Sequence, residues 1–281
     1  MNIPKENIFA IPSKDRLNDE SVDLLAQAGI NVQIPGRQLS AETALPEVGR
    51  FTVALMRPKD IVKSVAAGEI QLGIAGLDTV EEGRLSLDQL DQAEQYRMSR
   101  ERVNRPPNFN FTKILLGLEI GRTRLVLAAA ENCGFKTEQE WWDSVKSWKG
   151  ADERLRWLTV ATSYPALTER FLRGLRPGLE DTDKTFLQVK EMSGAIEVAP
   201  AIGLADAIAD LVETGTTLEA NGLVELTTIF ESEAVLITSV NRRGESRMVD
   251  AIYRRLYNSF LKRGADPFDR LRGYEQFRVL V

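Results

Sequence analysis

The order of apolar and polar residues alternates between two patterns in residues 7–82. Three short apolar runs, each of the length of a β-strand, are followed by segments whose apolar residues recur with helical spacing. The apolar runs are residues 7–12, 51–56 and 70–76, and the helical segments are residues 21–28, 58–67 and 77–82. This repeated order of strand, turn and helix predicts an α/β fold with a mostly parallel sheet and helices on its faces.

Beyond a polar segment at residues 88–110, the same two patterns continue. They predict strands at residues 115–131 (two strands), 155–161, 223–230 and 232–237, and helices at residues 167–175 and 247–262. Residues 137–148 predict a further amphipathic helix. Its Trp141, Trp142 and Trp148 are more typical of a face packed on the protein's own body than of a cofactor site.

Residues 197–221 have the pattern with the clearest chemical meaning. Apolar side chains at positions 202, 204, 205, 208, 211 and 212 recur at nearly helical spacing, which predicts one helix over residues 204–213. Asp206 and Asp210, four residues apart, would share a face of this helix. The loop Thr214-Gly215-Thr216-Thr217 would end the helix, and residues 218–221 can begin another short turn.

This threonine-rich loop has the features of a phosphate-binding loop. A loop that leads into a helix presents unpaired N–H groups, Gly215 lets the backbone approach a ligand, and threonine hydroxyls add donors. The same residues also suit a helix C-cap followed by an N-cap, with no ligand. Asp210 favours the ligand, because a sugar phosphate offers hydroxyls to a carboxylate beside the loop.

Four other residues have both a functional and a structural interpretation. Lys14 and Arg16 flank a turn from strand to helix, where open α/β sheets bind ligands, but they can equally be solvated charges. Asp78 can bind a ligand or cap a helix. Tyr164 can stack on an adenine or belong to the core.

The amino-acid composition excludes several kinds of catalytic site and partner. Histidine is absent and Cys133 is the single cysteine, so imidazole catalysis, histidine metal sites and an internal disulfide framework are excluded. A net charge of −5 without a long basic run argues against a nucleic-acid partner. The chain has no apolar run of about eighteen residues and no secretory signal at its start, so we expect a cytoplasmic protein that does not span a membrane.

Ten positions in the threonine-loop segment resemble the signature of ATP phosphoribosyltransferase, the enzyme that opens histidine biosynthesis. They are Glu197, Gly203, Ala205, Ile208, Asp210, Leu211, Thr214, Gly215, Thr217 and Leu218. The segments RPKDI, GIAGLDTVEE and ATSYPALTERFL are similar to this family as well, and the resemblance covers most of the first 237 residues. Asp15 departs from the family, which has a Lys-Gly-Arg-Leu motif at this place.

The resemblance implies a two-lobed α/β fold, similar to type II periplasmic binding proteins, with mixed, mostly parallel sheets and an active site in the cleft between the lobes. The first lobe would comprise residues 1–112 and 222–240, the second lobe residues 113–221, and the C-terminal helix and tail residues 241–281. An unrelated class of phosphoribosyltransferases has a similar loop after a β-branched strand. The alanine-rich helix predicted here would distinguish the two classes.

The implied reaction transfers the phosphoribosyl group of phosphoribosyl pyrophosphate to N1 of ATP and releases pyrophosphate. Mg²⁺ would be bound with the substrate phosphates, without a metal site made of protein residues alone. The threonine-rich loop would bind the 5-phosphate, Asp210 the ribose hydroxyls, and nearby cations the remaining phosphates. The predicted catalytic residues are Lys14, Arg16 and Asp210, and the predicted substrate-binding residues are Arg57, Asp78, Tyr164, Glu197, Thr214, Gly215, Thr216 and Thr217.

Two other functions stay open. The chain could be a non-catalytic nucleotide or sugar-phosphate binding subunit that derives from the enzyme and is weakened by Asp15. It could also be a transport-type solute-binding protein, which the missing secretory signal and the phosphate-loop signature disfavour. Release of pyrophosphate in the presence of both substrates and Mg²⁺ separates the enzyme from the binding subunit.

The resemblance also bears on regulation. Long members of the family carry a C-terminal domain that binds histidine, whereas short members rely on a partner similar to histidyl-tRNA synthetase. Only residues 238–281 follow the last predicted strand, and insertions at 96–110 and 132–156 account for much of the length, so we expect the short form. We expect a homodimer or larger assembly, with contacts through residues 247–262 and the tryptophan face.

A short-form enzyme purified alone is expected not to be inhibited by histidine. Titration of histidine into the isolated chain by calorimetry tests this, and micromolar binding would contradict it.

Overall fold

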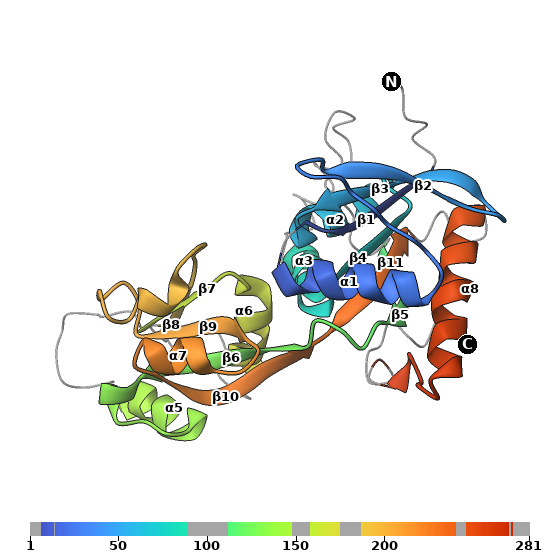
Figure 1. The fold of residues 1–281 in the computed structure, drawn as a ribbon. Coiled ribbons are helices and arrows are strands. Elements are labelled where there is room, and N and C mark those ends of the chain that lie inside the picture. The colour runs from blue at the N-terminus through green and yellow to red at the C-terminus, as the bar shows by residue number, and fades with distance from the viewer. Residues whose placement is uncertain are drawn as a thin grey trace. The chain divides into compact units, whose positions relative to one another are not determined.

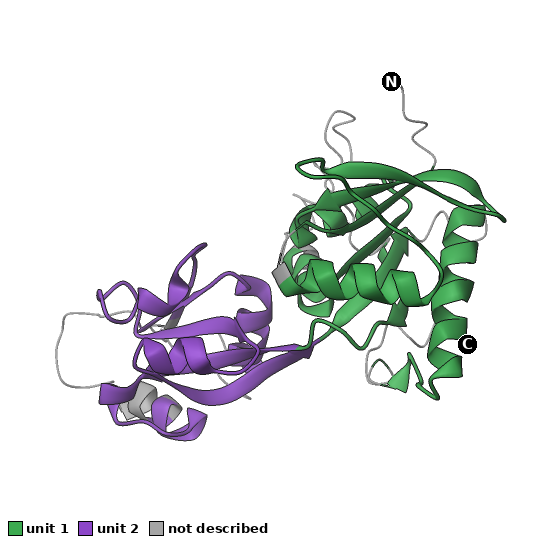
Figure 2. Ribbon diagram, viewed as in Figure 1, with its two compact units in different colours: residues 1–122, 233–281 green, residues 123–232 purple. Residues whose placement is uncertain are grey.

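The computed structural model describes residues 7–13, 15–88, 112–147, 158–174, 187–239, 246–269 and 271. The chain forms two compact units, residues 1–122 with 233–281 (unit 1) and residues 123–232 (unit 2), shown in Figure 2. The predicted boundaries, after residues 112 and 221, are therefore too early. The predicted separate C-terminal region is also part of unit 1.

Unit 1 contains a six-stranded mixed sheet in the order β2-β3-β1-β4-β11-β5 (Figure 1). Its strands are β1 (Ile8–Pro12), β2 (Ser40–Leu45), β3 (Gly49–Met56), β4 (Leu72–Gly76), β5 (Thr112–Gly117) and β11 (Ala234–Ser239). The central strand β1 pairs in parallel with β3 and β4, and β11 pairs antiparallel with β4 and β5. Because β5 and β11 complete this sheet, the chain leaves unit 1 only after residue 122 and returns at residue 233.

Four of the described helices cover the sheet of unit 1. They are α1 (Asp15–Gln27), α2 (Pro58–Ala66), α3 (Leu77–Asp88) and α8 (Arg247–Lys262). Apolar residues of α1 and α8 share one buried cluster with Leu72 and Ile74 of β4, whereas Gly73 between them faces α2. Six side chains of α8 are buried, so this helix belongs to the core of unit 1 and is not a detached tail.

Close packing at Gly73 gives a testable expectation for stability. A Cβ atom at this position would lie 2.4 Å from Ile61 Cγ2 and 3.3 Å from Val65 Cγ2, and both side chains are themselves fully buried. We expect Gly73→Ala to lower the free energy of unfolding by roughly 1–3 kcal/mol through overpacking, measured by urea denaturation. As a control, Gly174→Ala meets no heavy atom within 4 Å and lies in a helix, so it should be neutral or stabilising.

Unit 2 contains a five-stranded mixed sheet in the order β10-β6-β9-β7-β8. Its strands are β6 (Thr123–Ala130), β7 (Leu158–Thr162), β8 (Leu187–Glu191), β9 (Ala207–Val212) and β10 (Leu223–Ser232), and its helices are η2 (Glu131–Cys133), α5 (Glu138–Ser147), α6 (Pro165–Gly174), η3 (Ile196–Val198) and α7 (Thr216–Ala220). The predicted class, an α/β protein with two parts that each contain a mixed sheet, is confirmed.

The helix predicted over residues 204–213 is wrong, because this segment forms strand β9. It pairs antiparallel with β6 and parallel with β7, so it lies inside the sheet. Ala207, Ile208 and Ala209 are completely buried in succession, as expected for a strand covered on both faces. Such a continuous apolar run has no clear period, and the helical propensity of its alanines favoured the wrong choice.

The tryptophan helix is observed as α5, and the one tryptophan of this helix whose side chain is described is inside. Trp141 is 2% exposed, which agrees with a face packed on the protein's own body and removes this side chain from the predicted subunit contact. The side chain of Trp142 and all of Trp148 lie outside the described residues, as do the predicted insertion at 96–110 and part of that at 132–156.

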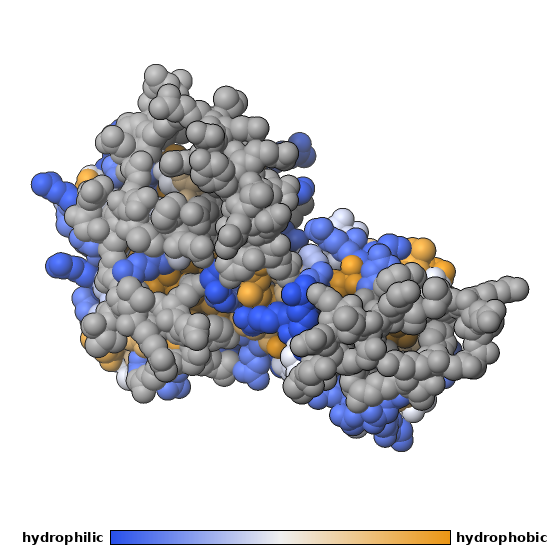
Figure 3. Space-filling model, turned by 180° about the vertical axis from the view of Figure 1, so that it is seen from behind, coloured by the Kyte–Doolittle hydropathy of each residue, from blue (hydrophilic) through white to orange (hydrophobic). Residues whose placement is uncertain are grey.

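On the face drawn in Figure 3, the coloured residues include both hydrophilic areas and separate hydrophobic patches. The large apolar side chains that are most exposed are Leu39, Val198, Ile202, Leu204 and Leu261. Among the helices that the structure describes, none is long and apolar enough to cross a membrane.

Candidate functional site

The threonine-rich loop connects the end of β9 to the short helix α7. Gly215 is the residue before this helix and has a φ of +87°, in the left-handed region. A Cβ atom there would meet no heavy atom within 4 Å, so the backbone angle, not crowding, is what calls for glycine in the free protein. The alternative in which Gly215 caps the C-terminus of a preceding helix is wrong, because a strand precedes the loop.

The loop exposes hydrogen-bond donors, and the residue that follows it is anchored in the apolar core of unit 2. Thr214, Thr216 and Thr217 are exposed, and the hydroxyls of Thr214 and Thr216 lie 3.1 Å apart. Leu218, which follows them, is buried in the apolar cluster of unit 2 and fixes α7 to the sheet. The N–H groups of a first helical turn have no partner within the helix, so backbone and hydroxyl donors are available together on one short segment.

Asp210 stands on β9, two residues before the strand ends, and its carboxyl group is partly buried. Burial raises the pKa of Asp210, and the nearby negative charge of Glu197 raises the pKa further. The backbone N–H of Leu211 opposes both effects by donating to Asp210 Oδ1 at 2.9 Å. The structure thus brings together two predicted site residues, Asp210 from β9 and Glu197 from η3.

This arrangement suits a ligand that carries both a phosphate and hydroxyl groups. The loop offers N–H and O–H donors, and the carboxylate of Asp210, a few residues upstream, can accept hydrogen bonds from hydroxyls. A partly buried carboxylate also interacts strongly with positive charge, because the surrounding medium screens it less than water does.

The predicted cationic residues are on unit 1, at the edge of the sheet where the parallel strands β1, β3 and β4 end. Pro12 at the end of β1 is paired directly with Met56 at the end of β3, so the segments carrying Arg16 and Arg57 start side by side. Arg16 is 51% exposed and forms an ion pair with Glu20, and Arg57 is exposed in front of α2. Ligands of open α/β sheets bind at this edge. Lys14 lies outside the described residues.

Asp78 follows β4 at the same edge but is only 4% exposed. Its Oδ1 lies 2.2 Å from the position of a Cβ on Gly76, and Thr79 Oγ1 is 3.3 Å from its Oδ2. Asp78 is therefore folded back onto the start of α3, which favours the structural interpretation. A direct contact between Asp78 and substrate stays a prediction.

Tyr164 of unit 2 is 8% exposed and precedes α6. Its backbone N–H donates to Thr162 Oγ1 at 2.9 Å, and its carbonyl accepts from Thr168 Oγ1 at 2.8 Å. These contacts place Tyr164 in a tight turn between β7 and α6 and favour a core role. Stacking on adenine stays a prediction.

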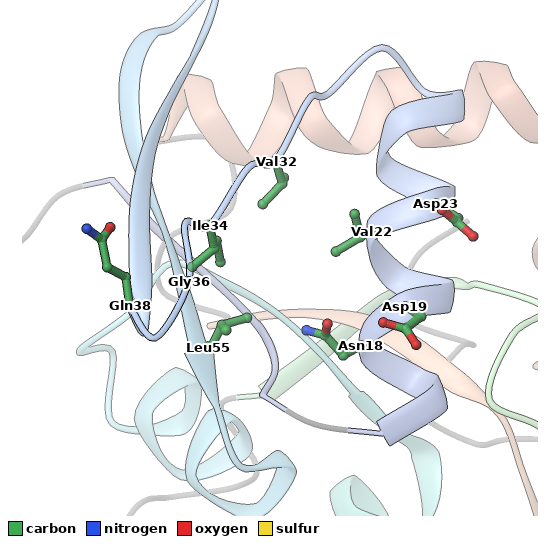
Figure 4. A pocket seen from close by; sticks show the side chains of 9 residues that line it. All are labelled: Asn18, Asp19, Val22, Asp23, Val32, Ile34, Gly36, Gln38 and Leu55. Carbon is green, nitrogen blue, oxygen red and sulfur yellow. The ribbon is translucent and has the colours of Figure 1, made fainter.

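A further cavity of about 500 Å³ in unit 1 is less suited to phosphate (Figure 4). It lies between α1 and residues 32–38, and Asp19 and Asp23 line it beside apolar side chains such as Val22 and Leu55. Because its lining includes two carboxylates and no basic residue, it would repel an anion.

Comparison with known proteins decides the family. Residues 57–258, most of the chain, match the family HisG, ATP phosphoribosyltransferase. The chain belongs to the ATP phosphoribosyltransferase family. The matched range includes the threonine-rich loop, Asp210 and Glu197, whereas Lys14 and Arg16 precede it.

Individual relatives agree with this assignment. The ATP phosphoribosyltransferase of Methanococcus maripaludis strain C5 is 32% identical over 232 residues, which cover 83% of this chain and 64% of the relative. That of Natronomonas pharaonis is 35% identical over 231 residues, covering 81% of this chain and 64% of the relative. The chain thus spans just under two thirds of the length of these relatives.

One solved structure has a fold similar to that of this chain. It is the ATP phosphoribosyl transferase (HisG:HisZ) complex from Thermotoga maritima, with a TM-score of 0.58 and 20% sequence identity. The similarity covers 91% of this chain and 99% of the other, so it extends over both units.

Three charged residues outside the predicted site form ion pairs that were not predicted from the sequence. Glu20 pairs with Arg16, and the four-residue spacing of opposite charges on one helix could have indicated this pair. Arg124 of β6 forms a bidentate pair with Glu225 of β10, which raises the pKa of the guanidinium. No sequence pattern indicates that second pair, because the two residues meet only when β6 and β10 align.

Proposed function

We propose that this chain is an ATP phosphoribosyltransferase that joins C1 of phosphoribosyl pyrophosphate to N1 of ATP in the first step of histidine biosynthesis. The C1–N1 bond forms while the bond between C1 and the pyrophosphate oxygen breaks, and pyrophosphate leaves with that electron pair. The observation that carries this proposal is the loop of β9 and α7, with Gly215 in the left-handed region and Asp210 beside Glu197, within the family match.

The residues present fit this chemistry without histidine. The adenine N1 already has a lone pair, so the protein does not need a strong base to create the nucleophile. The main difficulty is positive charge on the ribosyl group and negative charge on the leaving pyrophosphate, which fixed charges and dipoles can stabilise. Asp210 would accept hydrogen bonds from the ribose hydroxyls and stabilise the ribosyl charge, and the loop would hold the 5-phosphate.

Lys14, Arg16 and Arg57 would bind the pyrophosphate group or the phosphates of ATP. Arginine suits this role because its planar donors match phosphate oxygens and it stays charged. Holding both substrates in line would contribute much of the remaining rate enhancement.

Mg²⁺ is the metal that this reaction implies. Magnesium commonly binds through one or two carboxylates together with substrate phosphates, and not in a cage made by protein alone. Among the described residues, Asp210 and Glu197 offer two carboxylates close enough to interact, which fits this mode. Bound there with the substrates, Mg²⁺ would neutralise phosphate charge.

The second candidate function is a non-catalytic subunit that binds a nucleotide or sugar phosphate. The observation in its favour is Asp15, which heads α1 where the family has glycine. The two functions are separated by incubating the chain with ATP, phosphoribosyl pyrophosphate and Mg²⁺, and measuring pyrophosphate release and the near-ultraviolet absorbance of the ribosylated adenine. Binding of both substrates without either signal would support the non-catalytic subunit and contradict the enzyme.

Replacing Asp15 with glycine is expected to leave activity equal or to raise it. Asp15 is the first residue of α1 and has no positive φ, so its backbone does not need glycine, and the expected gain comes from removing a negative charge beside the phosphates. Steady-state kinetics of both proteins test this. A marked fall in turnover would mean that Asp15 has an adapted role, such as contact with a metal ion.

The proposed function includes assembly and a partner. We propose that the chain acts in the cytoplasm as a homodimer or larger oligomer, with a possible regulatory subunit similar to histidyl-tRNA synthetase. The solved Thermotoga maritima relative is a HisG:HisZ complex, which is compatible with such a subunit. Light scattering of the purified chain measures the oligomeric state directly.

A further inference from the structure

The carboxylate of Glu20 on α1 contacts two parts of unit 1 that are far apart in the sequence. The backbone N–H of Gly121 donates to Glu20 Oε2 at 2.7 Å, across 101 residues of sequence. Arg16 Nε lies 3.1 Å from the other oxygen, Glu20 Oε1. The side chain of Glu20 is only 30% exposed, so both interactions are partly shielded from water. Each oxygen of this carboxylate therefore holds a different group.

The backbone that this carboxylate holds is the last part of unit 1 before the chain enters unit 2. Within the described residues, Glu119 is the only non-glycine residue with a positive φ, at +57°, and Gly121 follows at +61°. The N–H of Leu118 donates to the carbonyl of Ala234, and the N–H of Ala234 donates to the carbonyl of Ile120, both at 2.9 Å. The outgoing segment is thus hydrogen-bonded to the strand by which the chain returns.

Packing makes the contact between α1 and this segment specific. A Cβ atom on Gly121 would lie 2.6 Å from Leu17 Cδ1 and 3.6 Å from the Cβ of Ala234. The positive φ of Gly121 favours glycine there, and a Cβ would also force the side chain of Leu17 to shift. The first two turns of α1 are fixed to the outgoing segment by an apolar contact and by the carboxylate of Glu20.

We propose that Glu20 is a positioning residue: it orients the guanidinium of Arg16 for a phosphate and ties the start of α1 to the segment through which the chain leaves unit 1. This inference rests on the proposed function, which assigns a phosphate ligand to Arg16. A long side chain held in one orientation loses less conformational freedom when it binds an anion. The ion pair with Glu20 uses Nε, and a guanidinium carries five N–H donors, so one arginine can contact more than one acceptor.

Two substitutions on the same helix separate this role from a general effect of charge. Glu20→Gln loses the negative charge and one of the two acceptor oxygens, so it cannot offer a separate oxygen to Gly121 and to Arg16. Asp23→Asn is the matched control, because it removes one negative charge from an exposed position of α1 with no ion pair or side-chain hydrogen bond among the described residues. Inorganic pyrophosphate, titrated by calorimetry, is the probe.

We expect Glu20→Gln to weaken pyrophosphate binding roughly fivefold, the scale of a partly exposed ion pair. The KM for phosphoribosyl pyrophosphate should rise by a similar factor, while kcat changes less than about twofold. Asp23→Asn should alter neither quantity. Hydrogen exchange at the Gly121 amide should accelerate in Glu20→Ala and stay unchanged in Asp23→Asn.

A double-mutant cycle with Arg16→Ala decides whether Glu20 acts through Arg16. In the Arg16→Ala background, Glu20→Gln should have no further effect on pyrophosphate affinity. An equal effect in both backgrounds, or a Glu20→Gln protein that binds like Asp23→Asn, would overturn the positioning role and leave the proposed function intact. Normal affinity and turnover in Arg16→Ala alone would instead refute the phosphate assignment of Arg16, on which the inference rests.

Discussion

Asp210→Asn is expected to lower turnover roughly a hundredfold, the scale observed when one preorganised electrostatic group is removed from an active site. Asparagine keeps the size of the side chain and one acceptor oxygen but loses the charge that would stabilise the ribosyl group. Steady-state kinetics of pyrophosphate release measure the effect. As a matched control, Glu219→Gln removes a negative charge from an exposed position of α7 close to the loop and should be neutral.

The same substitution should not destabilise the fold at neutral pH. The pKa of Asp210 is raised in the folded protein, mainly by burial, so the ionised form is less favourable in the folded than in the unfolded chain. Its contribution to stability is fully present below the pKa of the unfolded state and is lost as pH rises through the raised folded pKa. Asparagine does not ionise, so the Asp210→Asn protein should not lose this stability as the pH rises.

Unfolding by urea at several pH values checks the stability of Asp210→Asn. A lower turnover together with equal or higher stability would identify Asp210 as a functional residue held at some cost to the fold. Near-normal turnover would mean that Asp210 does not contact the reacting groups. Glu197→Gln gives an independent check, because removing the nearby charge should lower the pKa of Asp210 towards its ordinary value.

The α/β class could be predicted from sequence because the strands and helices of unit 1 have different periods and clear ends. Pro58 at the start of α2 and Gly68 just after its last turn mark the two ends of that helix. Strand β9 lacks the apolar–polar alternation that identifies a strand, because Ala207–Val212 pairs with β6 and β7 along its edges and successive residues on both of its faces are buried. Pairing with β6 and β7 overrides local propensity there.

The strand at residues 207–212 also bears on how this family differs from other phosphoribosyltransferases. The predicted alanine-rich helix was to separate this family from the other phosphoribosyltransferases that have a similar loop, but a strand precedes the loop here as well. The wider signature, which includes Glu197 and the segments around Arg57 and Asp78, carries the family assignment instead.

The candidate site was predictable where it is local in sequence and unpredictable where it depends on tertiary contacts. The loop at Gly215 was found because a glycine among threonines has a recognisable local conformation. The burial of Asp78 and the hydrogen bond between Glu20 and the Gly121 amide depend on segments that are far apart in the chain. Neither contact leaves a pattern in the sequence around it.

Gly215→Val is expected to weaken binding of phosphoribosyl pyrophosphate by at least tenfold and to reduce stability only modestly. Valine at a φ of +87° would strain the loop by roughly 1–2 kcal/mol, although the free protein has open space around the added side chain. A bound phosphate would have to approach the backbone where the new Cβ stands, and a misplacement of about 1 Å can cost roughly a hundredfold in rate. Calorimetric titration of the substrate measures the loss.

A matched glycine separates strain from loss of the binding site. Gly134 of unit 2 also has a positive φ, at +79°, and a Cβ there would meet no heavy atom within 4 Å. Gly134→Val should therefore lose a similar amount of stability while keeping normal substrate affinity. Gly215→Asn completes the series, because asparagine tolerates the left-handed region but still adds a side chain at the phosphate. If both Gly215 variants bind the substrate as the natural chain does, the loop of Thr214 to Thr217 does not hold the 5-phosphate.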